Sequence, residues 1–185
     1  MINDILEDAE QRMRGAIASF QADLDTFRTG RASPAMLDRI SVEMYGSEMR
    51  IIELASVSVP EPQQLAIKPY DPSSISAIER GILKSELGLT PNNDGVIIRL
   101  FLPPLTEERR RDLSKQVSKR LEEAKVSIRN VRRSALNDLR ELKSEKMVSE
   151  DEFSGGQDRL QKVTDSYIGR ADAAGKAKEE EIMTI

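Results

Sequence analysis

The sequence contains no cysteine, no histidine and no tryptophan, and only 4% of its 185 residues are aromatic. Thiol nucleophiles, Ser-His-Asp triads and metal sites built on histidine or cysteine are therefore excluded. Neither a GxxxxGK[ST] loop nor a GxGxxG turn occurs, so the common nucleotide-binding loops are absent. An active site made only of carboxylates remains open. We expect a protein that is not an enzyme and that uses no cofactor and no metal ion.

Long apolar runs are missing as well. A membrane-spanning helix needs about 18 or more consecutive apolar residues, and no such run occurs. The first eight residues, MINDILED, are acidic and amphipathic, whereas a secretory signal has a basic start and a continuous apolar core. We therefore expect a cytoplasmic protein with no membrane partner, and the lack of cysteine agrees with that expectation.

Three segments have apolar residues at steps of three and four, which predicts amphipathic helices at 2–28, 106–146 and about 150–182. Gly30 suits the position just past the end of the first helix. Ser149 and Glu152 resemble a capping box at the start of the third. Because glycine weakens a helix, we expect the third helix to fray near its start, at Gly155 and Gly156, and near its end, at Gly175.

The middle segment, 31–105, has a different pattern. Alternating residues at 40–45 and 49–52, around Gly46-Ser47, predict a β-hairpin. Further strands are predicted at 55–59, 64–67 and 96–101, with a tight turn at 92–95. A short helix should follow Asp71. Its inner face should be Ile75, Ile78, Ile82 and Leu83. We expect Tyr45 and Tyr70 to be packing residues.

An amphipathic helix does not remain alone in water, because its apolar stripe must be buried. The sequence therefore predicts an α+β protein in which an elongated antiparallel three-helix bundle, 1–29 plus 106–185, carries an inserted small α+β domain, 30–105. Two chain crossings, at 29–31 and 102–105, would join the two parts and act as a hinge. The hinge residues are Thr29, Gly30, Arg31, Pro103 and Pro104.

Basic residues are concentrated in one part of an otherwise acidic chain. The formal net charge is −4, yet segment 107–133 holds ten basic and five acidic residues. On a helical wheel, many of these bases fall on one side of the apolar face. Segregated charges leave bases unneutralised, whereas a solvated face with i,i+4 ion pairs has alternating signs. We call the bases on that side of the helix the basic stripe: Arg111, Lys115, Lys125, Arg129, Arg132 and Arg133 from this segment, and Arg140 just beyond it.

The basic stripe predicts binding to phosphate groups. Arginine predominates at 129, 132 and 133, and arginine suits bidentate phosphate contacts. Because stacking aromatic residues are nearly absent, recognition of folded RNA by shape and backbone is favoured over readout of single strands. Charge alone does not separate RNA from DNA. The alternatives are a helical adaptor that binds another protein and a general RNA-binding chaperone.

Four motifs, in this order, resemble the ribosome recycling factor family. They are RTGRA at 28–32 followed by Pro34, LGLTPNNDG at 87–95, PPLTEERR at 103–110 and RNVRR at 129–133. The resemblance covers essentially the whole chain. It implies an L-shaped monomer with tRNA-like dimensions that binds the post-termination ribosome on large-subunit rRNA.

The same resemblance implies a role in translation termination. With elongation factor G and GTP, the protein would promote dissociation of the ribosomal subunits and release from mRNA. The family's rRNA-contacting arginines correspond to Arg129, Arg132 and Arg133, with Arg110 in addition. Together with Lys125 of the basic stripe, these are the candidate RNA-binding residues.

Overall fold

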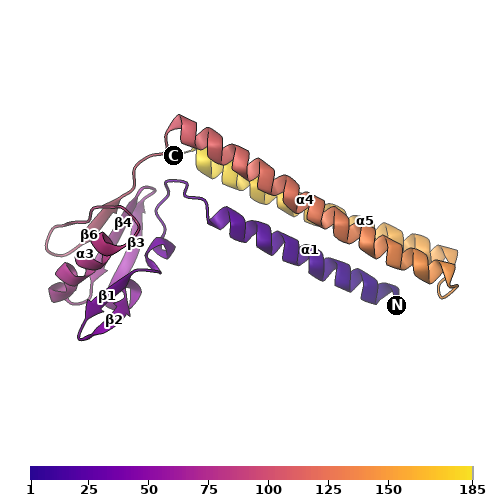
Figure 1. The fold of residues 1–185 in the computed structure, drawn as a ribbon, viewed down its shortest axis with the longest axis horizontal. Helices are drawn as coiled ribbons and strands as arrows, with labels where there is room; N and C mark the ends of the chain where they lie inside the picture. The colour runs from indigo at the N-terminus through magenta and orange to yellow at the C-terminus, as the bar shows by residue number, and fades with distance from the viewer. Residues whose placement is uncertain (185) are drawn as a thin grey trace. The chain divides into compact units, whose positions relative to one another are not determined.

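The computed structural model describes residues 1–184, which form two compact units. The first unit consists of residues 1–28 and 107–184, and the second consists of residues 29–106. The chain thus leaves the first unit after Arg28 and returns to it after Thr106. The α+β class predicted from the sequence is confirmed, because one unit is helical and the other contains the sheets (Figure 1).

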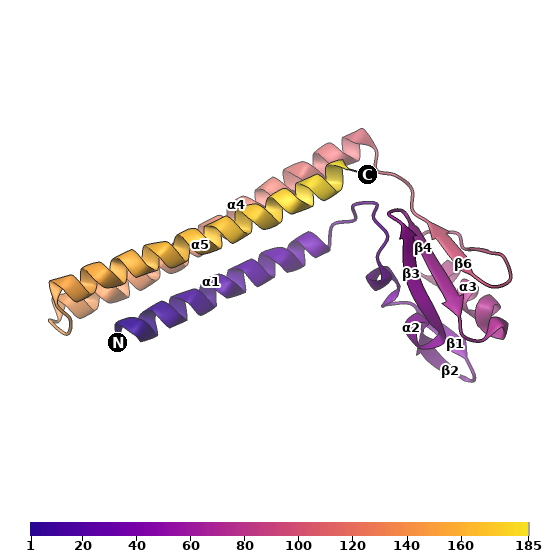
Figure 2. The same ribbon diagram turned by 180° about the vertical axis from the view of Figure 1, so that it is seen from behind.

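The first unit is a bundle of three helices: α1 (Ile2–Asp25), α4 (Glu107–Ser144) and α5 (Glu150–Met183). Both ribbon views place the three helices side by side, with the N-terminus at the end where α4 turns into α5 (Figures 1 and 2). Helix α4 therefore runs antiparallel to the other two. Their apolar stripes form one core, which includes Met13, Phe20, Leu24, Leu113, Val117, Ile128, Leu139, Leu160 and Tyr167.

Helix α1 is shorter than the prediction of 2–28, because it ends at Asp25. The Thr26 hydroxyl donates to the carbonyl of Asp23 at 2.6 Å, and the backbone N–H of Phe27 donates to the carbonyl of Leu24 at 3.1 Å. These short-range bonds close the last turn, as is common at helix ends. Gly30, with φ at +78°, therefore lies several residues beyond the helix and does not cap it.

Helix α5 is continuous across its glycines, so the expected fraying is wrong. A Cβ atom on Gly156 would lie 3.1 Å from Cγ2 of Ile2, and one on Gly175 would lie 3.1 Å from Cδ2 of Leu121. The two glycines are buried because neighbouring helices approach them closely. The capping box at the start of α5 is confirmed, since Ser149 and Glu152 exchange hydrogen bonds at 3.1 and 2.7 Å.

The second unit contains two antiparallel sheets. Strands β1 (Ser41–Met44) and β2 (Ser47–Arg50) form a hairpin, and a four-stranded sheet has the order β3-β4-β6-β5. Its strands are β3 (Ala55–Glu61), β4 (Gln64–Pro69), β5 (Asn92–Asn93) and β6 (Ile98–Phe101). The helices are η1 (Pro34–Leu37), α2 (Ile51–Leu54), η2 (Pro72–Ser74) and α3 (Ile75–Lys84).

Several local predictions for this unit are corrected by the structure. Residues 51–52 open helix α2 instead of continuing the hairpin. The hairpin turns at Tyr45 and Gly46, which both have positive φ, a combination typical of a type I′ turn. The side chain of Leu83 is 60% exposed and does not belong to the inner face of α3. Tyr45 and Tyr70 are also exposed, so they are not packing residues.

The core of the second unit lies between the sheets and α3. It contains fourteen buried residues, among them Val42, Leu65, Ile67, Ile78, Ile82, Ile98 and Leu100. Helix α3 packs so closely on β1 that a Cβ atom on Gly81 would lie 3.0 Å from the carbonyl oxygen of Ser41. Glycine at this position therefore sets the distance between the helix and the hairpin.

Candidate nucleic-acid interface

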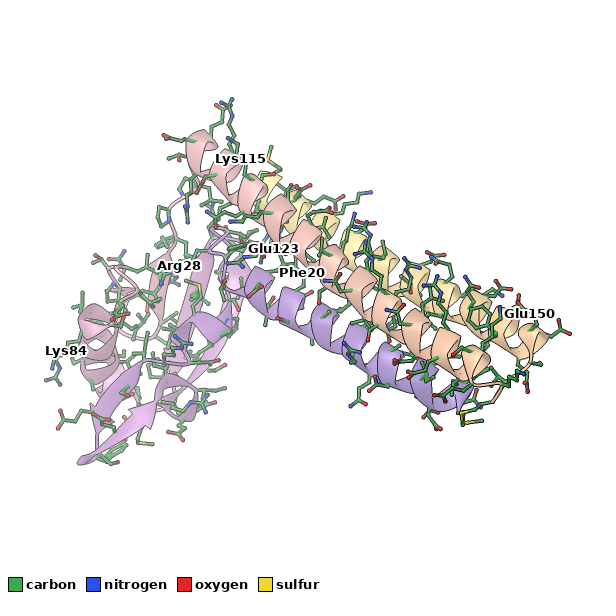
Figure 3. All side chains as sticks on the ribbon, turned by 45° about the vertical axis from the view of Figure 1, so that its right-hand side comes forward. Phe20, Arg28, Lys84, Lys115, Glu123 and Glu150 are labelled. Atoms are coloured by element: carbon green, nitrogen blue, oxygen red, sulfur yellow. The ribbon has the colours of Figure 1, made fainter. Side chains whose placement is uncertain are left out.

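The candidate RNA-binding cations all project from helix α4, which carries its apolar residues on one face and the basic stripe beside them. Figure 3 labels Lys115 near the start of α4, where the side chains project outward from the bundle, and Glu150 at the opposite end. Helix α5 packs along the side of α4 that borders the stripe, because Ser118 and Lys125 both contact α5 side chains. The stripe is therefore bordered on one side by the α4–α5 seam.

Lys125 lies in this seam. Its Nζ atom is 2.5 Å from a carboxylate oxygen of Asp172 on α5, and its side chain is only 19% exposed. One heptad earlier on α4, the Ser118 hydroxyl is 3.2 Å from a carboxylate oxygen of Glu179. The ammonium group of Lys125 is thus held by its own chain and is not presented freely to solvent.

Arg129 has a carboxylate partner on its own helix. Its Nη1 atom lies 3.3 Å from Oε1 of Glu122, and the two side chains are 44% and 64% exposed. An exposed pair of this kind contributes little free energy, because water and salt screen it. A phosphate group can therefore displace Glu122 at small cost, and the Arg129 guanidinium remains a candidate contact.

Arg132 and Arg133 differ from these two cations. Within residues 1–184 neither side chain forms an ion pair or a hydrogen bond, and Arg133 is exposed while Arg132 is half-buried. An arginine that pairs with a carboxylate of its own chain must release that partner before it binds phosphate, and these two arginines have no such partner in the described part. Among the candidate RNA-binding arginines, these two can therefore bind an external phosphate without first breaking a contact within residues 1–184, and Arg133 is the more exposed of the two.

Arg110 lies at the end of the bundle, where its Nη1 atom donates to the backbone carbonyl of Met183 at 3.1 Å. Met183 is the last residue of α5, so the guanidinium sits at the negative end of that helix dipole and satisfies an unpaired carbonyl. Its Nε atom is buried without a partner in the described residues. The geometry gives Arg110 a structural role in addition to the proposed RNA contact.

The proposed hinge residues cluster where the two chain crossings meet within the second unit. A Cβ atom on Gly30 would lie 3.5 Å from Cγ of Leu105 and 3.6 Å from the carbonyl oxygen of Pro103. The N–H of Ala32 donates to the carbonyl of Pro62 at 2.7 Å. Thr29 is buried, and Arg31 and Pro104 are exposed. The two crossings are thus adjacent, and Gly30 supplies a backbone conformation that other residues rarely adopt.

A row of acidic residues on α5 is a feature that the analysis of the sequence missed. Asp151, Asp158, Asp165, Asp172 and Glu179 recur every seven residues. Side chains at this spacing turn by only about 20° per step around a helix, so they form a nearly straight row. We call it the acidic row. Its period is visible in the sequence, but its position beside the basic stripe depends on how α4 and α5 pack.

The described residues offer little support for other kinds of site. Residues 1–184 contain no cluster of three or more acidic side chains placed to hold a metal ion. Within the same range, no helix is both long and apolar enough to cross a lipid bilayer.

Comparison with known proteins identifies the family. A family model described as ribosome recycling factor matches residues 20–183. The chain belongs to the ribosome recycling factor family. Relatives named ribosome-recycling factor from Roseiflexus castenholzii and Halalkalibacterium halodurans are 49% and 52% identical over 185 residues, with 100% of both chains covered in each comparison. The resemblance carried by the four sequence motifs is therefore confirmed.

Solved structures of ribosome recycling factors have the same fold. A solution structure of the ribosome recycling factor is 43% identical, with 100% of this chain and 98% of that chain covered and a TM-score of 0.75. A second neighbour has a TM-score of 0.64, 38% identity and 99% of each chain covered. Its title describes models of the T. thermophilus ribosome recycling factor and the E. coli elongation factor G bound to the E. coli post-termination complex. Family membership thus places this chain in protein biosynthesis, at ribosome recycling.

Proposed function

We propose that this protein binds the post-termination ribosome through large-subunit rRNA and, with elongation factor G and GTP, promotes dissociation of the subunits and release from mRNA. The observation that carries the proposal is a pair of arginines, Arg132 and Arg133, on a basic helix of an acidic protein. Within residues 1–184 neither of them has a carboxylate partner. Family membership and the neighbour whose title names elongation factor G and the post-termination complex support the same reading.

The proposed role requires no catalytic step by this chain. Helix α4, 38 residues long, spans roughly 57 Å at about 1.5 Å per residue and is stiffened by packing against two other helices. A rigid rod of this kind holds its guanidinium groups at fixed spacing, which suits a folded RNA surface better than a flexible strand. GTP hydrolysis would occur on the partner, and this protein would supply binding energy and shape.

The hinge belongs to the same proposal. Force applied to the second unit by a partner would be redirected through the two adjacent crossings at 29–31 and 102–105. Gly30 provides the rotatable backbone, while Pro103 and Pro104 restrict the other crossing because each proline fixes its own φ. The hinge would let the second unit swivel while the bundle stays bound to rRNA.

The test compares ribosome binding by the single variants Arg132→Ala and Arg133→Ala over a range of salt concentrations. Each lost phosphate contact should reduce the slope of log K against log salt by about 0.9. Arg12→Ala is the matched control, because Arg12 lies on α1, is exposed and forms an ion pair with Asp8. Polysome breakdown with elongation factor G and GTP should fall in parallel with binding. Affinities and slopes equal to those of the control variant would refute the rRNA contact.

A further inference from the structure

The acidic row on α5 lies along the edge of the basic stripe, and the contacts between the two helices fix its register. Asp172 pairs with Lys125 at 2.5 Å, and Glu179 accepts from Ser118 at 3.2 Å. Since α4 and α5 are antiparallel, a step of seven residues forward on α4 matches a step of seven residues back on α5. The same register sets Arg132 level with Asp165, whose carboxylate accepts a hydrogen bond from Gln161 at 2.9 Å.

At Lys125 and Ser118 the seam is therefore occupied by the carboxylates of Asp172 and Glu179, while the outer edge of the stripe is open. Asp172 is 50% exposed and neutralises a lysine that is only 19% exposed. On the outer edge, Arg133 is exposed and has no ion pair in the described part of the chain. A phosphate that approached Lys125 would have to displace Asp172 and would meet the repulsion of its neighbours in the row.

We propose that the acidic row is a specificity determinant that excludes flexible single-stranded RNA from the α4–α5 seam. This inference rests on the proposed rRNA-binding function. A flexible strand gains affinity by following any continuous series of cations, and a groove between two helices would offer such a path. A rigid RNA surface contacts only the outermost cations of the stripe. Carboxylates in the seam therefore lower the affinity for folded RNA only slightly. Discrimination is thus achieved by repulsion of the wrong ligand.

Net charge alone does not account for this arrangement. Acidic residues spread over the surface would lower the affinity for every RNA equally. A row beside the cations acts over a few ångströms, well inside the screening length of about 8 Å at physiological salt. The position of each carboxylate therefore matters, and two substitutions with the same change in charge should have different effects.

The experiment measures the affinity of the full-length protein for vacant ribosomes and for oligouridylate, in the wild type and in Asp172→Asn. Asp138→Asn is the matched control, because Asp138 is exposed on α4, on the side of the apolar face away from the stripe, and the change in charge is the same. Asp172→Asn should bind oligouridylate roughly tenfold more tightly than the control, the change expected for one released charge-assisted contact. Its salt slope should be steeper by about 0.7.

A double variant completes the test. Lys125→Gln together with Asp172→Asn removes the released cation, so the affinity for oligouridylate should return to the control value. Ribosome affinity should rise less than threefold in Asp172→Asn, since the outer arginines are unchanged. Equal gains for ribosomes and oligouridylate, or no gain beyond the control, would overturn the proposal. Failure of the proposed function is separate, because it would appear as unchanged ribosome binding in Arg133→Ala.

Circular dichroism and thermal unfolding establish whether Asp172→Asn is folded. Should this variant unfold, Asp165→Asn provides the same test one heptad along the row, where the carboxylate does not hold an ion pair in the described residues. The proposal requires Asp165→Asn to raise the affinity for oligouridylate above that of Asp138→Asn. An affinity equal to that of the control would count against it.

Discussion

The hydroxyl group of Tyr167 on α5 donates a hydrogen bond to Oε1 of Glu10 on α1, at 3.1 Å. The ring of Tyr167 is 2% exposed and is one of the largest fully buried side chains. On the same side chain, the guanidinium of Arg170 lies over the ring, 4.6 Å from its centroid. One tyrosine therefore fills the core, joins two helices that are distant in the sequence and carries a cation on its face.

Tyr167→Phe should destabilise the bundle by about 1 kcal/mol, because a net hydrogen bond is lost while the ring continues to fill the core. The cost stays modest because the Glu10 carboxylate is 42% exposed and water can replace the hydroxyl. Urea unfolding followed by helical circular dichroism measures the change. Tyr70→Phe is the control, since Tyr70 is 71% exposed and should show no effect. Equal stability of the two variants would contradict the assignment.

Gly155 and Gly175 offer a paired test of helix packing. A Cβ atom on Gly155 would meet no atom within 4 Å, whereas one on Gly175 would lie 3.1 Å from Cδ2 of Leu121. Gly155→Ala should therefore stabilise the bundle by about 0.5–1 kcal/mol through helix propensity alone. Gly175→Ala should be less stable than Gly155→Ala by about 1 kcal/mol, since Leu121 must move. The free energies of unfolding of the two variants are compared directly, and the reverse order would contradict close packing at Gly175.

The glycines illustrate what the sequence could and could not predict about the fold. Periodicity predicted all three long helices, because apolar residues at steps of three and four lie on one face of a helix, which must be buried. The glycines were interpreted as weak points because propensity is a local property. Their actual role, the approach of Ile2 and Leu121, depends on residues far away in the chain. The positive φ of Tyr45 places the hairpin turn at Tyr45-Gly46 and not at the predicted Gly46-Ser47. This backbone conformation could not be predicted from the sequence either.

The candidate interface was predictable in part for the same reason. The stripe follows from the spacing of residues on one helix, so Arg132 and Arg133 could be proposed from the sequence. The neutralisation of Lys125 could not, because its partner Asp172 is on another helix and is brought near only by antiparallel packing. Arg110 was likewise proposed for RNA contact, while its hydrogen bond to Met183 depends on where α5 ends. Tertiary contacts decide which cations of a stripe remain available.

Asp94 should make the stability of the second unit depend on pH. Its carboxylate accepts from the backbone N–H groups of Ile97 and Val96, at 2.8 and 3.0 Å, and from Arg99 at 2.9 Å. These bonds, the Ile97 N–H first, lower the pKa of Asp94 from 3.8 to about 2. The pKa of Asp94 in the folded protein is below its value in the unfolded chain. The contribution of this carboxylate to the free energy of unfolding is therefore complete above pH 3.8 and is lost as the pH falls through about 2.

Asp94→Asn removes this titration and keeps an oxygen for the backbone donors. Between pH 3.8 and pH 2, the stability of the variant should fall less steeply than that of the wild type. Hydrogen exchange of the amides at positions 96 and 97, measured by NMR across this range, reports on the turn itself. If the exchange rates of these two amides depended on pH in the variant as they do in the wild type, the turn would be stabilised by residues other than Asp94.

The two prolines of the second crossing should limit the motion of the second unit. Since the chain has no cysteine, Ser19→Cys and Glu48→Cys place one label on each unit at exposed positions. Pro103→Gly with Pro104→Gly frees two φ angles that proline fixes, so the distribution of label distances should broaden. Pulsed electron spin resonance measures that distribution. Pro60→Gly is the control, because Pro60 lies in β3, away from both crossings.

If the distribution of label distances stays as narrow as in the control while recycling activity also stays unchanged, Pro103 and Pro104 are not hinge residues. A broader distribution with lower activity would show that the direction of motion, and not flexibility as such, is what the prolines provide.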